Sequence, residues 1–99
     1  MADVSRSSGV LGASAIVSRN QCRLKSIHAS IVIVSNAAVT IKVFDSLDNS
    51  GTELARMHHT TTGQYNIEYD MHGVLASTAL FLEVTEVGSS TANVSVEFN

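Results

Sequence analysis

Four histidines are the side chains of this sequence best suited to metal chemistry, because imidazole nitrogens are common ligands for zinc and copper. His58 and His59 are adjacent, whereas His28 and His72 lie far from them in the sequence. Neighbouring side chains on a β-strand point to opposite faces, so His58 and His59 cannot bind one ion together. A metal site would need one of them to meet His72 across strands or across a subunit boundary. We expect solvated or hydrogen-bonded surface histidines instead, and no metal site.

The segment from Asp45 to Gly51 has the short polar side chains of a calcium-binding loop but not their order. Its third position is Leu47, where an acid or amide is needed, and its twelfth is Arg56, where a bidentate glutamate belongs. The segment therefore predicts a polar turn, in which Gly51 can adopt a positive φ.

Residues for hydrolytic chemistry are present singly but not in working combinations. Ser14 lies in Gly12–Ile16, which lacks the second glycine of a nucleophile elbow, and no sequence frame pairs a serine or Cys22 with a recognisable base. Glu68 and Asp70 share one strand face, where alternating acids usually serve solvation. We therefore predict no catalytic residue, no cofactor and no enzyme activity.

Compartment and partner class follow from composition. The start Met-Ala-Asp-Val-Ser-Arg has no apolar core of a signal peptide, so the glycosylation triplet at Asn93 is expected to be a chance match. Cys22, the only cysteine, cannot form an internal disulfide and is expected to pack as a small apolar residue in a reducing cytoplasm. A net charge of −3 disfavours nucleic-acid binding, and the apolar runs are far short of the ~20 residues that span a membrane.

The elements that would position these residues are strands. Ile31 to Val34 is a run of β-branched residues that favours a strand buried on both faces. Val39, Ile41 and Val43 alternate with Thr40, Lys42 and Phe44, which is the period of a strand with one buried face. Cys22 to Val34 is long for one strand, so a bulge or bend is expected near Ser26 to Ser30.

The rest of the chain continues this pattern. Val10–Val17 predicts a first strand, Thr52–His59 a partly exposed edge strand, and Tyr65–Met71 a strand with one wet face that ends at Gly73. Residues 73–78 have room for a single helical turn. Ala79–Val87 and Thr91–Phe98 are expected to form a hairpin.

Ninety-nine residues accommodate one domain with its own core. Seven to eight strands at a spacing of about ten residues predict an all-β, antiparallel β-sandwich of jelly-roll or Greek-key type. We place this domain at residues 10–99. Residues 1–9 are too polar to order themselves and are expected to be a flexible N-terminal arm, either a frayed end or a tail that lies on a neighbouring subunit.

Several segments together carry a family resemblance. They are Leu24–His28, Ala38–Asp45, Ser50–Leu54, Gly73–Leu75 leading to Leu80–Val84, and Ala92–Phe98. In this combination the chain resembles small virion structural proteins of tailed bacteriophages, cyanophages especially. The resemblance covers most of the chain after Arg19 and leaves the arm outside.

The resemblance implies a capsid decoration or cement protein, which binds the outer surface of the major capsid shell and stabilises it. The partners implied are the major capsid protein and further copies of the chain, with a trimer suggested by the family. Two alternatives stay open. A tail, neck or fibre protein would share the same sandwich, and a glycan-binding sandwich would use Tyr65, Tyr69 and the histidines as a stacking platform. The expected location is the virion surface, after synthesis in the host cytoplasm.

Overall fold

The computed structural model describes residues 5–35 and 37–99, and across these ranges the regular structure consists of β-strands. The strands are β1 (Arg6–Ser7), β2 (Ala15–Ser18), β3 (Cys22–Ile33), β4 (Ala38–Asp45), β5 (Thr52–His59), β6 (Gly63–Ala76), β7 (Leu80–Val87) and β8 (Thr91–Phe98). The predicted all-β class is confirmed.

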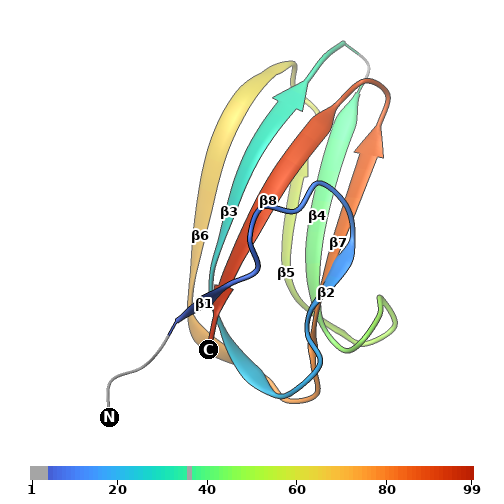
Figure 1. Ribbon diagram of the computed structural model, residues 1–99. Helices are drawn as coiled ribbons and strands as arrows, with labels where there is room; N and C mark the ends of the chain where they lie inside the picture. The colour runs from blue at the N-terminus through green and yellow to red at the C-terminus, as the bar shows by residue number, and fades with distance from the viewer. Residues whose placement is uncertain (1–4, 36) are drawn as a thin grey trace.

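The strands form two four-stranded antiparallel sheets that face each other (Figure 1). Sheet A has the order β1-β8-β3-β6, and sheet B has the order β2-β7-β4-β5. The first strand therefore pairs with the last, the second with the seventh, the third with the sixth and the fourth with the fifth. This pairing is the strand order of a jelly roll, so the sandwich belongs to the first of the two expected topologies.

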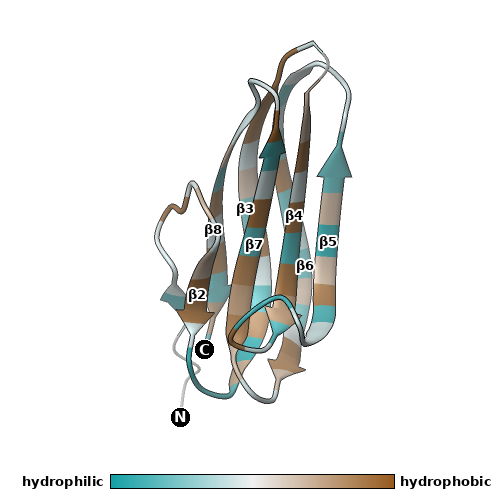
Figure 2. Cartoon of the chain, turned by 90° about the vertical axis from the view of Figure 1, so that its right-hand side faces the viewer, coloured by the Kyte–Doolittle hydropathy of each residue, from teal (hydrophilic) through white to brown (hydrophobic). Residues whose placement is uncertain are grey.

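Alternate residues of the central strands point into the space between the sheets and form the core. In β3 the burial pattern alternates strictly from Ile27 to Ile33, and in β4 it does so from Ala38 to Val43. Figure 2 shows the matching bands of apolar and polar residues along the strands. Each large apolar side chain of this core contributes about 1.5–3 kcal/mol to the stability of the fold when it is removed from water. The largest fully buried ones are Leu24, Ile27, Ile31, Ile33, Ile41, Leu80, Leu82, Val39, Val43, Val94 and Val96.

The expected hairpin between the last two strands is wrong. β7 lies in sheet B between β2 and β4, whereas β8 lies in sheet A between β1 and β3. The Gly88-Ser89-Ser90 connection thus crosses from one sheet to the other. Both strands bury apolar side chains between the sheets. Two strands can do so when they face each other in different sheets as well as when they are paired in one sheet.

The beginning of the chain also differs from expectation. Arg6 and Ser7 pair with Phe98 and Glu97, so this part of the expected arm is attached to sheet A, and residues 1–4 lie outside the described residues. Leu11 then forms a single bridge to Val94 of the same sheet. Of this first part of the chain, only β2 pairs within sheet B, so the single strand expected over residues 10–17 is wrong.

Two further expectations about strands are corrected. β6 does not end at Gly73 but continues to Ala76, because a bulge carries the chain through this point. The strand β3 keeps one wet face, since Val32 is 36% exposed, and Val34 just beyond it is 39% exposed. The bulge expected near Ser26 to Ser30 lies slightly earlier, at Lys25, where β3 has one residue more than its partner β8.

Candidate functional site

The outer face of sheet A, turned away from sheet B, gathers many of the polar side chains. β3 is flanked there by β8 and β6. His28 of β3 pairs with Ser95 of β8 and with Glu68 of β6. Directly paired residues point to the same side of an antiparallel sheet, so these three side chains stand together on the outer face.

A bulge of β6 opposite β3 lies beside a hollow near one end of this face. Between the pairs Ser26–Asp70 and Leu24–Val74, β3 has one residue where β6 has three. His72 and Gly73 take positive φ values of 53° and 75°, which bend β6 away from a regular ladder. The backbone N–H of His72 donates to Asp70 Oδ1 at 2.9 Å and fixes the bend from within β6.

The resulting hollow has a volume of about 880 Å³. Side chains of both charge signs line it. They are the cations Arg23 and Lys25, the carboxylates Glu68, Asp70 and Glu97, and the imidazoles His28 and His72. Arg23 Nη1 donates to the carbonyl oxygen of Gly73 at 3.2 Å, which pins one wall of the hollow. The mixture of donors and acceptors suits a polar occupant without a large net charge.

Ser26, His28 and the neighbouring acids superficially look like a nucleophile with its base. Ser26 Oγ lies 3.1 Å from His28 Nε2 and donates to Glu97 Oε1 at 3.2 Å. Glu68 Oε2 lies 3.6 Å from the same Nε2 of His28. A catalytic relay needs the serine on one ring nitrogen and the acid on the other. Here both approach Nε2, so the arrangement does not have the geometry of a catalytic relay.

Two smaller hollows adjoin the first and share His28 with it. One, of about 490 Å³, is floored by Ser30, Asn66, Asn93 and Ser95 and reaches Val10. The other, of about 280 Å³, lies against Ser5 to Ser7. We call the three hollows together the sheet A trough; its floor is β3 with parts of β8 and β6.

The trough is bounded on one side by the segment before β2. Lys25 Nζ donates to Ser5 Oγ at 2.9 Å, and the backbone N–H of Ser8 donates to the carbonyl oxygen of Val96 at 2.9 Å. Ser8 Oγ in turn accepts from the N–H of Val96 at 2.8 Å. These bonds hold the N-terminal segment against β8 and make it a wall of the trough.

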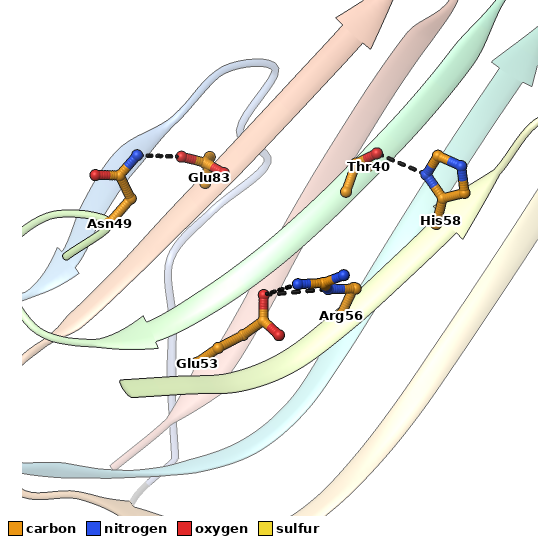
Figure 3. A network of polar contacts seen from close by, with 6 residues as sticks. All are labelled: Thr40, Asn49, Glu53, Arg56, His58 and Glu83. Atoms are coloured by element: carbon orange, nitrogen blue, oxygen red, sulfur yellow. Dashed lines mark hydrogen bonds and ion pairs between the residues drawn. The ribbon is translucent and has the colours of Figure 1, made fainter. Parts of the chain in front are cut away.

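The four histidines do not come together. His58 lies on the outer face of sheet B, where its Nδ1 is hydrogen-bonded to Thr40 Oγ1 at 2.7 Å (Figure 3). His59 pairs with the buried Val39 and stacks on Tyr65, with ring centroids 5.2 Å apart. The two are thus on opposite faces, as predicted. Among the described residues, no group of three or more His, Cys, Asp and Glu side chains is placed to hold a metal ion.

The polar turn after β4 has a structural role. Asp45 accepts hydrogen bonds from the backbone N–H groups of Thr78, Ser77 and Ala79 and from the Ser77 hydroxyl, at 2.8 to 3.4 Å. The bond from Thr78, followed by the others, holds the pKa of Asp45 below its ordinary value. Asn49 Nδ2 donates to Glu83 Oε2 at 2.8 Å, which folds the turn against the outer face of sheet B (Figure 3).

Gly51 is required in this turn for a reason other than the expected positive φ. A Cβ on Gly51 would lie 2.6 Å from the carbonyl oxygen of Asp45 and against the side chain of Ser46. Positive φ values are found instead at Gly9, Gly63, Gly73 and Gly88. Close approach of the backbone therefore sets the need for glycine at residue 51.

Three of the other residues considered for catalysis or glycosylation line the sheet A trough, and two lie outside it. The Ser14 hydroxyl accepts from the N–H of Val84 at 2.9 Å, so it ties the segment before β2 to β7. Cys22 is buried, and burial raises the pKa of its thiol. Asn93 lies exposed in the trough. Glu68 and Asp70 line the same hollow, as their shared strand face predicted.

The two tyrosines weighed as a stacking platform point toward the interior of the sandwich. Tyr65 pairs with Ile31 and Tyr69 with Ile27, and both of these isoleucines are buried. The Tyr65 hydroxyl donates to the carbonyl oxygen of Thr61 at 3.0 Å. Tyr69 keeps 39% of its surface exposed at the edge of the sheet.

No protein-family model matches the chain, and no curated protein matches it. Among the described residues, no helix is long and apolar enough to cross a membrane.

Proposed function

We propose that this chain is a non-enzymatic structural protein of a tailed-phage virion, of the decoration or cement type. In this role it binds the outer surface of the major capsid shell and stabilises it. The family resemblance of residues 24–98 supports the proposal, together with a jelly-roll body built for contact. The single observation that carries the binding role is the sheet A trough, in which three hollows meet at His28.

The trough supports attachment through many weak polar contacts. Its floor consists largely of short side chains, such as Ser30, Ser95, Asn66 and Asn93, which leave space and offer both donors and acceptors. A partner segment that settles over these four side chains can hydrogen-bond to groups that carry no charge. Such a fit gives specificity at little desolvation cost.

Stabilisation of a shell then follows from mass action. A protein that binds the assembled shell but not its free subunits adds RT ln(1 + [L]/Kd) to the stability of the assembly, about 2.7 kcal/mol per site at a free concentration of 100 Kd. A contact of about 800 Å² per partner is the ordinary size for a stable interface. Many copies on one lattice reinforce each other, so a modest affinity per copy is sufficient.

The test places a bulky charge on the trough floor. Ser30 is exposed on the outer face of β3, and the Ser30→Arg substitution fills the hollow there without touching the core. We expect occupancy of this variant on shells that lack the protein to fall at least about tenfold, which corresponds to about 1.4 kcal/mol. Quantitative mass spectrometry of washed particles measures the occupancy.

Thr85→Arg is the matched control, because Thr85 is an exposed residue of β7, in the other sheet. It adds the same side chain and the same charge, and we expect occupancy to stay unchanged. Equal binding of the two variants and the wild-type chain would remove the trough from the interface. A location at the tail or neck would instead show as a few copies at one vertex of the particle.

A further inference from the structure

β6 forms one edge of sheet A and is the longest strand, at 14 residues (Figure 1). Among the described strands it pairs only with β3. Its other edge therefore presents backbone N–H and C=O groups to the surroundings. A long edge of this kind is a template for another strand unless the chain interrupts it.

The interruption covers only one end of β6. From Gly63 to Asp70 the pairing with β3 runs without a shift, from Ile33 to Ser26. The bulge follows at residues 71–73, where His72 and Gly73 have positive φ. The first eight residues of β6 thus form an edge with regular pairing, and the bulge marks where pairing with an added strand would stop.

The apolar side of this edge is incompletely covered. Tyr65, Ile67 and Tyr69 all pair with buried residues of β3 and so face sheet B. Tyr65 and Ile67 are only half-buried, and Tyr69 is exposed. A strand added beside β6 would cover these side chains with its own apolar face.

Symmetry restricts the ways in which two copies can pair along this edge. In an antiparallel pair, directly opposed side chains lie on the same side of the sheet. The polar side of one β6 must therefore continue the polar side of the other. In a two-fold pair, this match of polar sides requires the symmetry axis to pass through a residue and not through a peptide bond. Four residues near the centre of the regular segment could lie on the axis: Asn66, Ile67, Glu68 and Tyr69.

Charge selects among the four. An axis at Glu68 opposes Glu68 to its own copy, and an axis at Tyr69 opposes Glu68 to Asp70; both place like charges together, which is unfavourable. An axis at Asn66 moves Asp70 beyond the end of the partner's strand, opposite Thr62. An axis at Ile67 has none of these faults and pairs every residue from Gln64 to Asp70 within the regular segment.

We propose that two copies of this chain associate through β6, antiparallel and with Ile67 on the two-fold axis. Glu68 then faces Asn66 of the second copy, and Asp70 faces Gln64, so that each acid accepts from an amide. On the apolar side Ile67 meets Ile67, and Tyr65 meets Tyr69. The pair joins two copies of sheet A into one eight-stranded sheet, and it does not depend on the virion role.

Substitution of Asn66, on the exposed polar side, tests the contact. Asn66→Glu opposes two acids twice across the axis, and we expect the dimer to dissociate at least about tenfold more readily. Asn66→Lys places a cation opposite Glu68, and we expect tighter association. Asn93→Glu is the matched control, because Asn93 is also an exposed amide on the outer face of sheet A but lies on β8.

Sedimentation equilibrium from about 1 to about 100 µM measures the mass against the 10.5 kDa of one chain. We expect a monomer–dimer equilibrium that Asn66→Glu weakens, Asn66→Lys strengthens and Asn93→Glu leaves alone. Far-ultraviolet circular dichroism checks that each variant is folded, and if Asn66→Glu is not, Asn66→Lys decides. A monomer at every concentration, a trimer, or an equal response to Asn66→Glu and Asn93→Glu would overturn the proposal.

Discussion

At the scale of single residues, Asp45 accepts more hydrogen bonds than any other carboxylate whose contacts are described. It stands at the end of β4 and accepts four hydrogen bonds from residues 77–79, more than thirty positions away in the sequence. These bonds close the connection between β6 and β7 over the end of sheet B. Hydrogen bonds to a charged acceptor are stronger than those to a neutral one, so the ionised form of Asp45 is the one that the fold stabilises.

Replacement of Asp45 by asparagine keeps the shape of the side chain and removes the charge. We expect Asp45→Asn to lower the free energy of unfolding at pH 7 by about 1–2 kcal/mol, because each bond to a charged acceptor is worth more than its neutral equivalent. Urea unfolding followed by circular dichroism measures the change. Asp48→Asn is the control: the hydrogen bonds of the Asp48 carboxylate come only from Ser50, so we expect a smaller effect.

The difference in stability between wild type and Asp45→Asn should depend on pH with a defined sign. The folded pKa of Asp45 is lower than its ordinary value of 3.8. Its contribution to stability is therefore complete above about pH 4–5 and is lost as the pH falls through the folded pKa. The difference between wild type and Asp45→Asn should shrink between pH 5 and pH 3. A difference that stays constant over this window would show that the charge of Asp45 is not the cause.

Features of single residues that depend only on the period of a strand could be predicted from the sequence. The separation of His58 from His59 follows from alternation alone. The contact between Ser26 and Glu97 could not be predicted, because the two residues are 71 positions apart and meet only through the pairing of β3 with β8. The same holds for Asp45 and its partners, whose polar side chains suggested a local turn and not a long-range anchor.

At the scale of elements, the turns and bulges shape the surface of the sandwich. The turn between β4 and β5 is held against sheet B by Asn49 and Glu83, and it needs glycine where the backbone of residue 51 passes Asp45. The bulge in β6 opens the largest hollow of the sheet A trough. In both places a few residues outside a regular ladder shape the surface.

The turn offers a clean test of close approach. We expect Gly51→Ala to lower the free energy of unfolding by about 1–3 kcal/mol, since the added Cβ meets backbone that cannot move aside. Thermal unfolding measures it. Gly12→Ala is the control, because a Cβ there would lie 3.7 Å from Asn93 Oδ1, an ordinary contact. If both substitutions are tolerated equally, close packing does not explain the glycine at residue 51.

The positions of most strands were predictable, because alternation marks them and Gly or polar clusters end them. The bounds of β5 and β8 match the prediction. The assignment of β7 and β8 to different sheets was not predictable from Gly88 to Ser90, since a short turn can join paired strands or facing ones. The extension of β6 past Gly73 was not predicted, because a glycine after a run of alternating residues can mark either the end of the strand or a bulge within it.

At the scale of the whole molecule, the two proposed contact surfaces adjoin each other and share Asn66, Glu68 and Asp70 of β6. The sheet A trough offers polar groups along a face, and the regular half of β6 offers a backbone edge. They lie on the same sheet, so a pair formed through β6 would carry two troughs side by side on one continuous face. That arrangement suits attachment to a lattice of repeated subunits, where two linked sites bind more firmly than one.

The location of the chain on purified particles tests the proposed function most directly. Electron microscopy of virions that carry a labelled copy of the chain, with image reconstruction, shows both copy number and orientation. We expect copies at regular positions over the outside of the head, with the outer face of sheet A turned toward the shell. Copies confined to one vertex, or particles without the chain, would contradict the decoration role.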